Sequence, residues 1–183
     1  MPTCRCLAFA ALLLAASTPA FAQQSQSQSQ SQSQDDATRS ATAWNSPEWW
    51  VDVNVASHHF GSADAYLGPG EHFNQANYGA GVELEWQPRH GASAGYYRNS
   101  VYADSWYALY HYTPLQLGRH VRLGAMVGLV SGYPGYDGHA GPAAALVAKI
   151  EYRRVGANLV YLPHVPGSTP NTLGLQLKFR LGR

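Results

Sequence analysis

Imidazole and hydroxyl side chains are the groups in this chain that could carry chemistry. His58 and His59 stand side by side at the end of an alternating segment, and Ser100 and Ser105 flank the gap between two later ones. An imidazole titrates near neutral pH and can act as a general base. A serine hydroxyl can act as a nucleophile or donate a hydrogen bond to a developing negative charge. The alternative is that all four are ordinary polar residues of surface loops.

The composition disfavours three other kinds of chemistry. The 8 histidines show no ligand spacing such as HxxxH, so we expect no metal and no cofactor. Both cysteines, Cys4 and Cys6, lie in an N-terminal segment that we expect to be removed, which excludes disulfides and thiol catalysis. Without Arg5 the 12 Lys and Arg residues become 11, equal to the 11 Asp and Glu residues, so we expect no nucleic-acid partner.

The chain divides into three parts by composition. Residues 1–22 have a basic residue, an apolar core and a small-x-small ending, which predicts a secretory signal peptide. Residues 23–45 include a Gln/Ser repeat that cannot bury a core and predict a low-complexity leader and linker. Residues 46–183 are long enough for one domain.

The domain has the pattern of an all-β protein. Its last segment, "NTLGLQLKFRL", alternates between apolar and polar residues over residues 173–181, which is the period of a strand. Short turns alternate with connections that are mostly longer and rich in Gly, Pro, Asn and Asp, which is typical of an up-and-down barrel. We therefore expect an eight-stranded antiparallel barrel with strands near 49–58, 78–86, 92–99, 105–113, 121–132, 143–153, 155–163 and 172–181.

Two barrels fit this alternation, and they differ in the direction of the apolar face. A secreted lipid-binding calyx places the apolar residues inside, whereas an outer-membrane barrel places them against lipid. Glycine favours the membrane barrel, because it weakens an exposed strand face but fits the narrow lumen of eight strands. The glycines of the more polar face are Gly79, Gly81, Gly95, Gly124, Gly128, Gly156 and Gly174.

With this orientation the lumen has two expected halves. The half near the short turns carries four acids and four bases, which predicts an enclosed ion-pair network. These are Asp52, Glu83, Glu85, Arg122, Lys149, Glu151, Lys178 and Arg180. The half near the long loops has an apolar inward face that includes Ala56, Leu109, Met126 and Gly128, and it is either a pocket for a hydrocarbon chain or an apolar plug.

Four segments resemble the outer-membrane lipid A palmitoyltransferase family in order and spacing. The resemblance spans roughly residues 49–181 and is that of a distant member. The segments are "VNVASHHF" (53–60), "FNQANYGAGVEL" (73–84), "GYYRNSVYADSWYALYHY" (95–112) and "VGANLVYLP" (155–163).

The resemblance implies an acyltransferase that moves a fatty acyl chain from a phospholipid to lipid A. It also implies a required histidine at the outer rim, which aligns with His58 on the expected inward face of the first strand. The family's Asp-Ser pair aligns with Asn99-Ser100, where the acid is an amide, or after a shift of five residues with Asp104-Ser105. Whether the serine is the nucleophile or an oxyanion donor stays open.

The same resemblance implies an acyl-chain pocket inside the barrel. We expect it to be lined by Leu109, Met126 and Gly128 and to end at His111, which aligns with the glycine that sets acyl length in the family. The expected protein is a monomer integral to the bacterial outer membrane, with a phospholipid as donor and lipid A or lipopolysaccharide as acceptor. The alternative function is a non-enzymatic eight-stranded barrel for envelope stability or adhesion.

Overall fold

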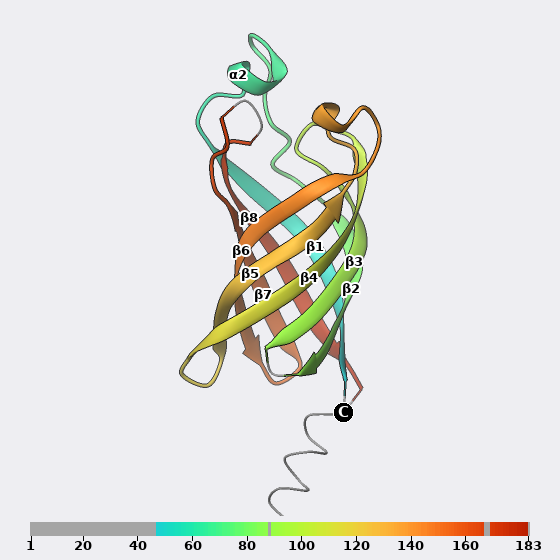
Figure 1. Ribbon diagram of the computed structural model, residues 1–183, viewed down its shortest axis with the longest axis vertical. Helices are drawn as coiled ribbons and strands as arrows, with labels where there is room; N and C mark the ends of the chain where they lie inside the picture. The colour runs from blue at the N-terminus through green and yellow to red at the C-terminus, as the bar shows by residue number, and fades with distance from the viewer. Residues whose placement is uncertain (1–46, 88, 167–168, 183) are drawn as a thin grey trace, which may run out of the picture. The chain divides into compact units, whose positions relative to one another are not determined.

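A computed structural model describes residues 47–87, 89–166 and 169–182. Eight antiparallel strands form one closed barrel in which each strand pairs with its neighbours in the sequence and β8 pairs with β1 (Figure 1). The strands are β1 Glu48–Phe60, β2 Gly79–Gln87, β3 His90–Arg98, β4 Asp104–Leu117, β5 Val121–Val130, β6 Gly141–Tyr152, β7 Val155–Leu162 and β8 Asn171–Leu181. The expected up-and-down barrel is confirmed, and each expected strand falls on an observed one. The expected signal peptide and leader lie outside the described residues.

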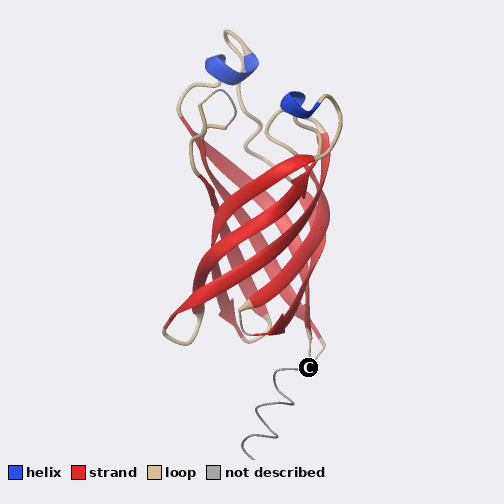
Figure 2. Ribbon diagram, in the orientation of Figure 1, coloured by secondary structure: helices blue, strands red, loops and turns tan. Residues whose placement is uncertain are grey.

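The connections differ strongly between the two ends of the barrel. Short connections join β2 to β3, β4 to β5 and β6 to β7 at the end where β1 begins and β8 ends. Residues 61–78, 99–103, 131–140 and 163–170 connect strands at the other end, where two short helices lie, α2 Asp64–Leu67 and η1 Pro134–Tyr136 (Figure 2). We call these the turn end and the loop end. No helix in the described part of the chain is long and apolar enough to cross a membrane.

The barrel is apolar outside and polar inside. Large exposed side chains such as Val127, Leu146, Leu177 and Phe179 face outward along the strands. Lys149, Lys178 and other charged residues are almost fully buried in the lumen. Leaving charges inside and large apolar side chains outside is unfavourable in water, but it is the arrangement of a barrel that spans a membrane.

A β-bulge in β1 changes which residues face the lumen. Asn54 pairs with Gln176, but Ala56 pairs with Leu175, so Val55 is an extra residue opposite β8. Such an insertion reverses the alternation for the rest of the strand. Ala56, which we expected to face inward, therefore lies on the outward face with Leu175.

We predict that Leu177→Arg strongly destabilises the folded barrel in lipid. Leu177 lies on the outward face of β8, where its side chain is 38% exposed, and it pairs with Val53 and Ala157. A charged residue near the middle of the lipid-facing band should cost about 2–4 kcal/mol of the free energy of unfolding. Urea unfolding in phospholipid vesicles measures this change, and an equal midpoint for variant and wild type would contradict the assigned orientation.

Candidate functional site

The two rim histidines exchange their expected positions. Because of the bulge at Val55, His58 pairs with Leu173 on the outward face and is exposed. His59 pairs with the buried Thr172 and faces inward. The expectation that His58 faces the lumen is therefore wrong, and the inward histidine at the loop end is His59.

His59 has the surroundings of a histidine that could bind a ligand. Its side chain is 8% exposed and its ring stacks on that of Phe73, with 4.2 Å between the ring centroids. Its Nδ1 atom is buried and has no hydrogen-bond partner among the described residues. The ring borders a cavity of about 460 Å³ within the first loop. The lining residues are His59, Gly61, Ser62, Ala63, Asp64, Gly70, Glu71, His72, Phe73 and Gln75.

His58 makes weaker contacts on the outside of the barrel. Its ring meets the edge of Phe60 at a centroid distance of 4.7 Å. Its Nδ1 atom lies 3.4 Å from the side-chain oxygen of Gln75, which is long for a hydrogen bond. These contacts fit a polar residue at the membrane surface better than a buried base.

One residue of each rival pair, Asn99 and Ser105, takes part in the same hydrogen-bond network. The buried amide of Asn99 donates to Ser105 Oγ at 2.8 Å and to the carbonyl oxygen of Gly132 at 2.8 Å. Its Oδ1 atom accepts from the backbone amides of Val101 at 3.0 Å and Ala103 at 2.8 Å. All hydrogen-bonding positions of the Asn99 side chain are therefore used, and they hold together the loop between β3 and β4.

Asp104 lies apart from this network. Its side chain is 76% exposed and accepts from Arg98 at 2.9 Å. An exposed carboxylate in a surface ion pair has little influence on a buried hydroxyl. The structure therefore brings Asn99 and Ser105 together and leaves Asp104 outside.

Ser100 is joined to the surroundings of His59 by two consecutive residues of the first loop. Phe73 stacks on His59, and the next residue, Asn74, donates its backbone amide to the carbonyl oxygen of Ser100 at 2.9 Å. The Asn74 side chain also donates to the carbonyl oxygen of Asn99 at 2.9 Å. The loop thus holds the histidine and the serine segments in one rim structure, although no direct contact joins His59 to Ser100 among the described residues.

Tyr133 adds a hydroxyl group next to Ser100. Its hydroxyl oxygen lies 3.0 Å from that of Tyr97. Burial raises the pKa of Tyr133, against the opposing effect of hydrogen bonds to Tyr97 and Ser100, so the phenol remains protonated at neutral pH. A neutral phenol can donate a hydrogen bond, which is the property that an oxyanion requires.

The lumen below the rim is more polar than expected. Leu109, Met126 and Gly128 lie on the inward face, as the alternation predicts. Gln176 accepts from Asn158 at 2.7 Å and donates to Asn54 at 3.0 Å and to the hydroxyl of Tyr107 at 3.1 Å. These four residues, Asn54, Tyr107, Asn158 and Gln176, form a layer that we call the amide layer. The expectation that the half of the lumen near the loop end is apolar is therefore wrong at the level of the amide layer.

Two glycines make room for the amide layer. Cβ atoms at Gly81 and Gly95 would collide with the Tyr107 hydroxyl and with backbone oxygens of the neighbouring strand. Tyr107 pairs with Gly95, which pairs with Gly81, so its ring can lie along the barrel wall. The glycines that predict a narrow lumen thus accommodate a tyrosine side chain.

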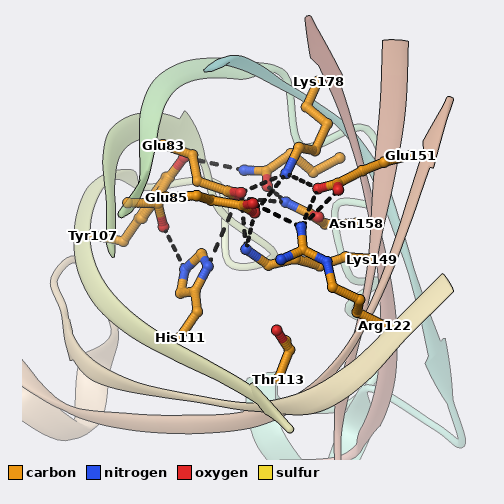
Figure 3. A network of polar contacts seen from close by, with 12 residues as sticks. Glu83, Glu85, Tyr107, His111, Thr113, Arg122, Lys149, Glu151, Asn158 and Lys178 are labelled. Atoms are coloured by element: carbon orange, nitrogen blue, oxygen red, sulfur yellow. Dashed lines mark hydrogen bonds and ion pairs between the residues drawn. The ribbon is translucent and has the colours of Figure 1, made fainter. Parts of the chain in front are cut away.

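The turn end of the lumen holds the expected ion-pair network (Figure 3). Lys149 donates to Glu83 at 2.8 Å and to Glu85 at 2.7 Å. Lys178 contacts Glu83, Glu85 and Glu151, and Arg122 contacts Glu85 at 2.7 Å and Glu151. Because their oxygens are bound by these cations, the three clustered carboxylates Glu83, Glu85 and Glu151 do not fit a metal site.

His111 belongs to this network. Its Nε2 atom lies 2.8 Å from Ser93 Oγ, and its Nδ1 atom lies 3.7 Å from a Glu83 oxygen. The residue is inward and buried, as expected. However, it lies beside the carboxylates, on the turn side of Tyr107 along β4, and not at the end of an open apolar slot.

The network is not balanced in the way that the sequence predicts. Arg180, expected as the fourth lumen base, contacts Glu48 at 2.8 Å near the turn end and is partly exposed. Asp52 is 0% exposed, and neither of its carboxylate oxygens has a hydrogen-bond partner among the described residues. Arg180 lies at the mouth of the lumen, over the buried ring of Trp50 at 4.8 Å, and the other charged residues expected in the lumen are four acids and three bases.

Some of these residues were missed although a sequence signal existed. Asn158 occupies an inward position of β7, so the alternation could have placed it in the lumen, as it places Gln176 on the polar face of β8. Phe73 and Tyr133 lie in loops without periodicity, and no sequence signal assigns their contacts.

Comparisons with known proteins identify no family for this chain. No family model and no curated protein matches the sequence. Among solved structures, the barrel is similar to "Backbone structure of the Yersinia pestis outer membrane protein Ail in phospholipid bilayer nanodisc", with 11% sequence identity and a TM-score of 0.41. That alignment covers 74% of this chain and 100% of the other.

Proposed function

We propose that the protein is an outer-membrane enzyme that transfers an acyl chain from a phospholipid to lipid A at its loop end. The observation that carries the proposal is the position of His59. It is a buried inward histidine at the rim, beside a cavity of about 460 Å³, and its Nδ1 atom has no partner in the described part of the chain. The family that the sequence resembles requires a histidine at this place, so His59 takes the role that the alignment gave to His58.

The reaction needs a base and hydrogen-bond donors. His59 takes the proton of an acceptor hydroxyl as that oxygen attacks the ester carbonyl of the phospholipid, and it returns the proton to the leaving oxygen. The hydroxyls of Ser100 and Tyr133 are the candidates for stabilising the oxyanion, and Ser100 is also the candidate nucleophile of a two-step reaction. One ester bond forms as another breaks, so the exchange requires no redox cofactor.

The proposed location follows from the two faces of the barrel. Its apolar exterior requires lipid, and closed β-barrels of this kind are typical of bacterial outer membranes. All eight strands are paired on both sides, so no strand edge invites a second copy, and we propose a monomer. The short turns then face the periplasm and the loops face outward.

A transfer assay tests the proposed activity. The purified protein, folded in detergent micelles, is mixed with lipid A and a phospholipid labelled in its sn-1 acyl chain. We expect lipid A to gain the mass of one acyl chain together with the label. Mass spectrometry of lipid A from cells with and without the gene extends the test to the membrane. The absence of any labelled product, with a folded barrel, would contradict the proposal.

We predict that Tyr107, and not His111, controls the acyl length accepted by such an enzyme. Tyr107 and the amide layer lie closer to the loop end than His111, so His111→Gly should leave the preferred length unchanged. Tyr107→Ala removes the ring and should allow longer chains, because each additional buried methylene contributes about 0.8 kcal/mol. Competition between phospholipids of graded sn-1 length measures both effects. If the preferred acyl length changed in His111→Gly but not in Tyr107→Ala, the pocket would end at the ion-pair network.

A non-enzymatic barrel is the second candidate, and two observations favour it. The hydrogen-bonding positions of Asn99 are all used within its own loop, and the amide layer occupies the lumen where an acyl chain would enter. On this alternative, deletion of the gene should leave lipid A unchanged in mass but increase the sensitivity of cells to detergent.

A further inference from the structure

The turn end of the barrel carries a group of exposed arginines that make no ion pair among the described residues. Arg89 lies in the turn between β2 and β3, Arg119 in that between β4 and β5, and Arg153 and Arg154 in that between β6 and β7. All four are exposed, and none has a carboxylate within 4.0 Å among the described residues. We call these four residues the arginine collar.

The opposite end of the barrel has the opposite charge. Asp64, Glu71, Asp104 and Asp137 are exposed at the loop end, where Arg98 is paired with Asp104. The whole chain has a formal net charge of only +1. The basic and acidic residues are therefore nearly equal in number but lie at opposite ends of the barrel. A protein whose only requirement were solubility would gain nothing from this separation, whereas a membrane presents one defined surface to each end.

Aromatic residues place the collar at the level of lipid headgroups. The Arg153 guanidinium lies over the ring of Tyr152 at 5.4 Å, and the His120 ring lies 5.3 Å from that of Tyr152. His90, next to Arg89, packs against the exposed Tyr112 at 5.0 Å. Exposed Tyr side chains concentrate at the boundary between hydrocarbon and headgroups, and arginines just beyond them extend into the headgroup layer.

The backbone at Arg153 supports a role in recognition outside the protein. The connection 153–154 has two residues, and Arg153 adopts a φ of 56° in the left-handed region. Asn and Gly occupy such positions in two-residue hairpin turns with less strain. Two adjacent arginines in this turn thus add strain and mutual repulsion, and among the described residues no carboxylate offsets them.

We propose that the arginine collar binds the phosphate groups of anionic phospholipids in the leaflet that surrounds the turn end. The collar comes from three of the hairpins around the barrel and lies beside the aromatic side chains, so it matches a ring of lipid headgroups better than a compact soluble ligand. Guanidinium groups bind phosphate in bidentate geometry and attract anionic lipid surfaces over a Debye length. The proposal does not depend on any enzymatic activity.

The test compares folding stability in two kinds of vesicle. The full barrel is folded into vesicles of phosphatidylcholine alone and into vesicles of the same acyl chains that also contain phosphatidylglycerol. We expect a higher urea midpoint in the anionic vesicles and loss of that gain at high salt, because salt screens the headgroup charge. In R89Q/R119Q/R153Q/R154Q the gain should disappear, while the midpoint in phosphatidylcholine stays near that of the wild type.

Two further measurements distinguish the alternatives. The variant R89K/R119K/R153K/R154K keeps the charge and should retain most of the gain, which also provides a folded comparison if the glutamine variant does not fold. Inorganic phosphate added to the wild type in phosphatidylcholine vesicles tests a soluble anion. A gain preserved in the glutamine variant, a wild type without any gain, or an equal gain from free phosphate would each overturn the proposal.

Discussion

Replacing His59 with alanine is expected to abolish the proposed acyl transfer and to leave a folded barrel. His59 lies at the loop end of β1, where its ring contacts Phe73 but its Nδ1 atom makes no hydrogen bond to any residue that the structure describes. A general base contributes about 10²–10⁴-fold to a rate, so its loss should bring transfer to the limit of detection. The transfer assay on labelled phospholipid measures the activity, and the change in gel mobility on heating reports whether the barrel is folded.

His58→Ala is the matched control for this prediction. The two histidines are adjacent, but only His59 is inward, so the control should keep most of the activity. His59→Phe preserves the stacking on Phe73 and removes the base, and it should be as inactive as the alanine variant. Loss of transfer in His58→Ala with activity kept in His59→Ala would assign the base to the outward residue and refute the proposed site.

The strands of this barrel could be predicted because the alternation persists through most of their length. In β8, Leu173, Leu175 and Leu177 face outward, and the register of β8 with β7 is continuous over these residues. In β1 the same reasoning fails after Asn54, because a bulge depends on how two strands pair and leaves no mark on the apolar pattern of one strand. The residues beyond the bulge are the ones on which the site depends.

The charged residues of the lumen could be predicted from the sequence, but not all of the contacts that they make. The alternation along their strands predicts that Lys149, Lys178 and Glu83 face the lumen. Their ion pairs follow, because a narrow barrel offers these charges no other partner. Arg180 has the same parity, but it lies close to the turn end and reaches Glu48. The alternation along a strand decides on which face a residue lies. Whether its side chain stays in the lumen also depends on the length of the side chain and on its distance from the end of the barrel.

The loop contacts of the candidate site could not be predicted in this way. The sequence allows Asn99-Ser100 and Asp104-Ser105 as separate pairs, but folding joins Asn99 to Ser105 through the geometry of a tight loop. Such contacts depend on backbone angles that no periodic signal specifies.

Lys178→Met should cost about 3–5 kcal/mol of the free energy of unfolding, because it leaves buried carboxylates without a cation. Lys178 is 0% exposed and contacts Glu83, Glu85 and Glu151, and its amino group lies 4.3 Å from the ring centroid of Trp50. Methionine has a similar length, so the loss reflects the charge and not a cavity. Urea unfolding in phospholipid vesicles, followed by tryptophan fluorescence and gel mobility, measures the change.

Asp52→Asn is the matched control, because Asp52 is the direct strand partner of Lys178 in β1. Its carboxylate is buried without a hydrogen-bond partner among the described residues, in a lumen that has four acids and three bases. Replacing this carboxyl group leaves three acids beside the three bases, so the variant should be as stable as the wild type or more stable. In the double variant Asp52→Asn/Lys178→Met, part of the loss should be recovered, because the excess of acids falls from two to one. If Asp52→Asn instead destabilised the barrel as much as Lys178→Met, then Asp52 would be a required partner of the lysine, and the lumen would have to hold a further positive charge that balances it.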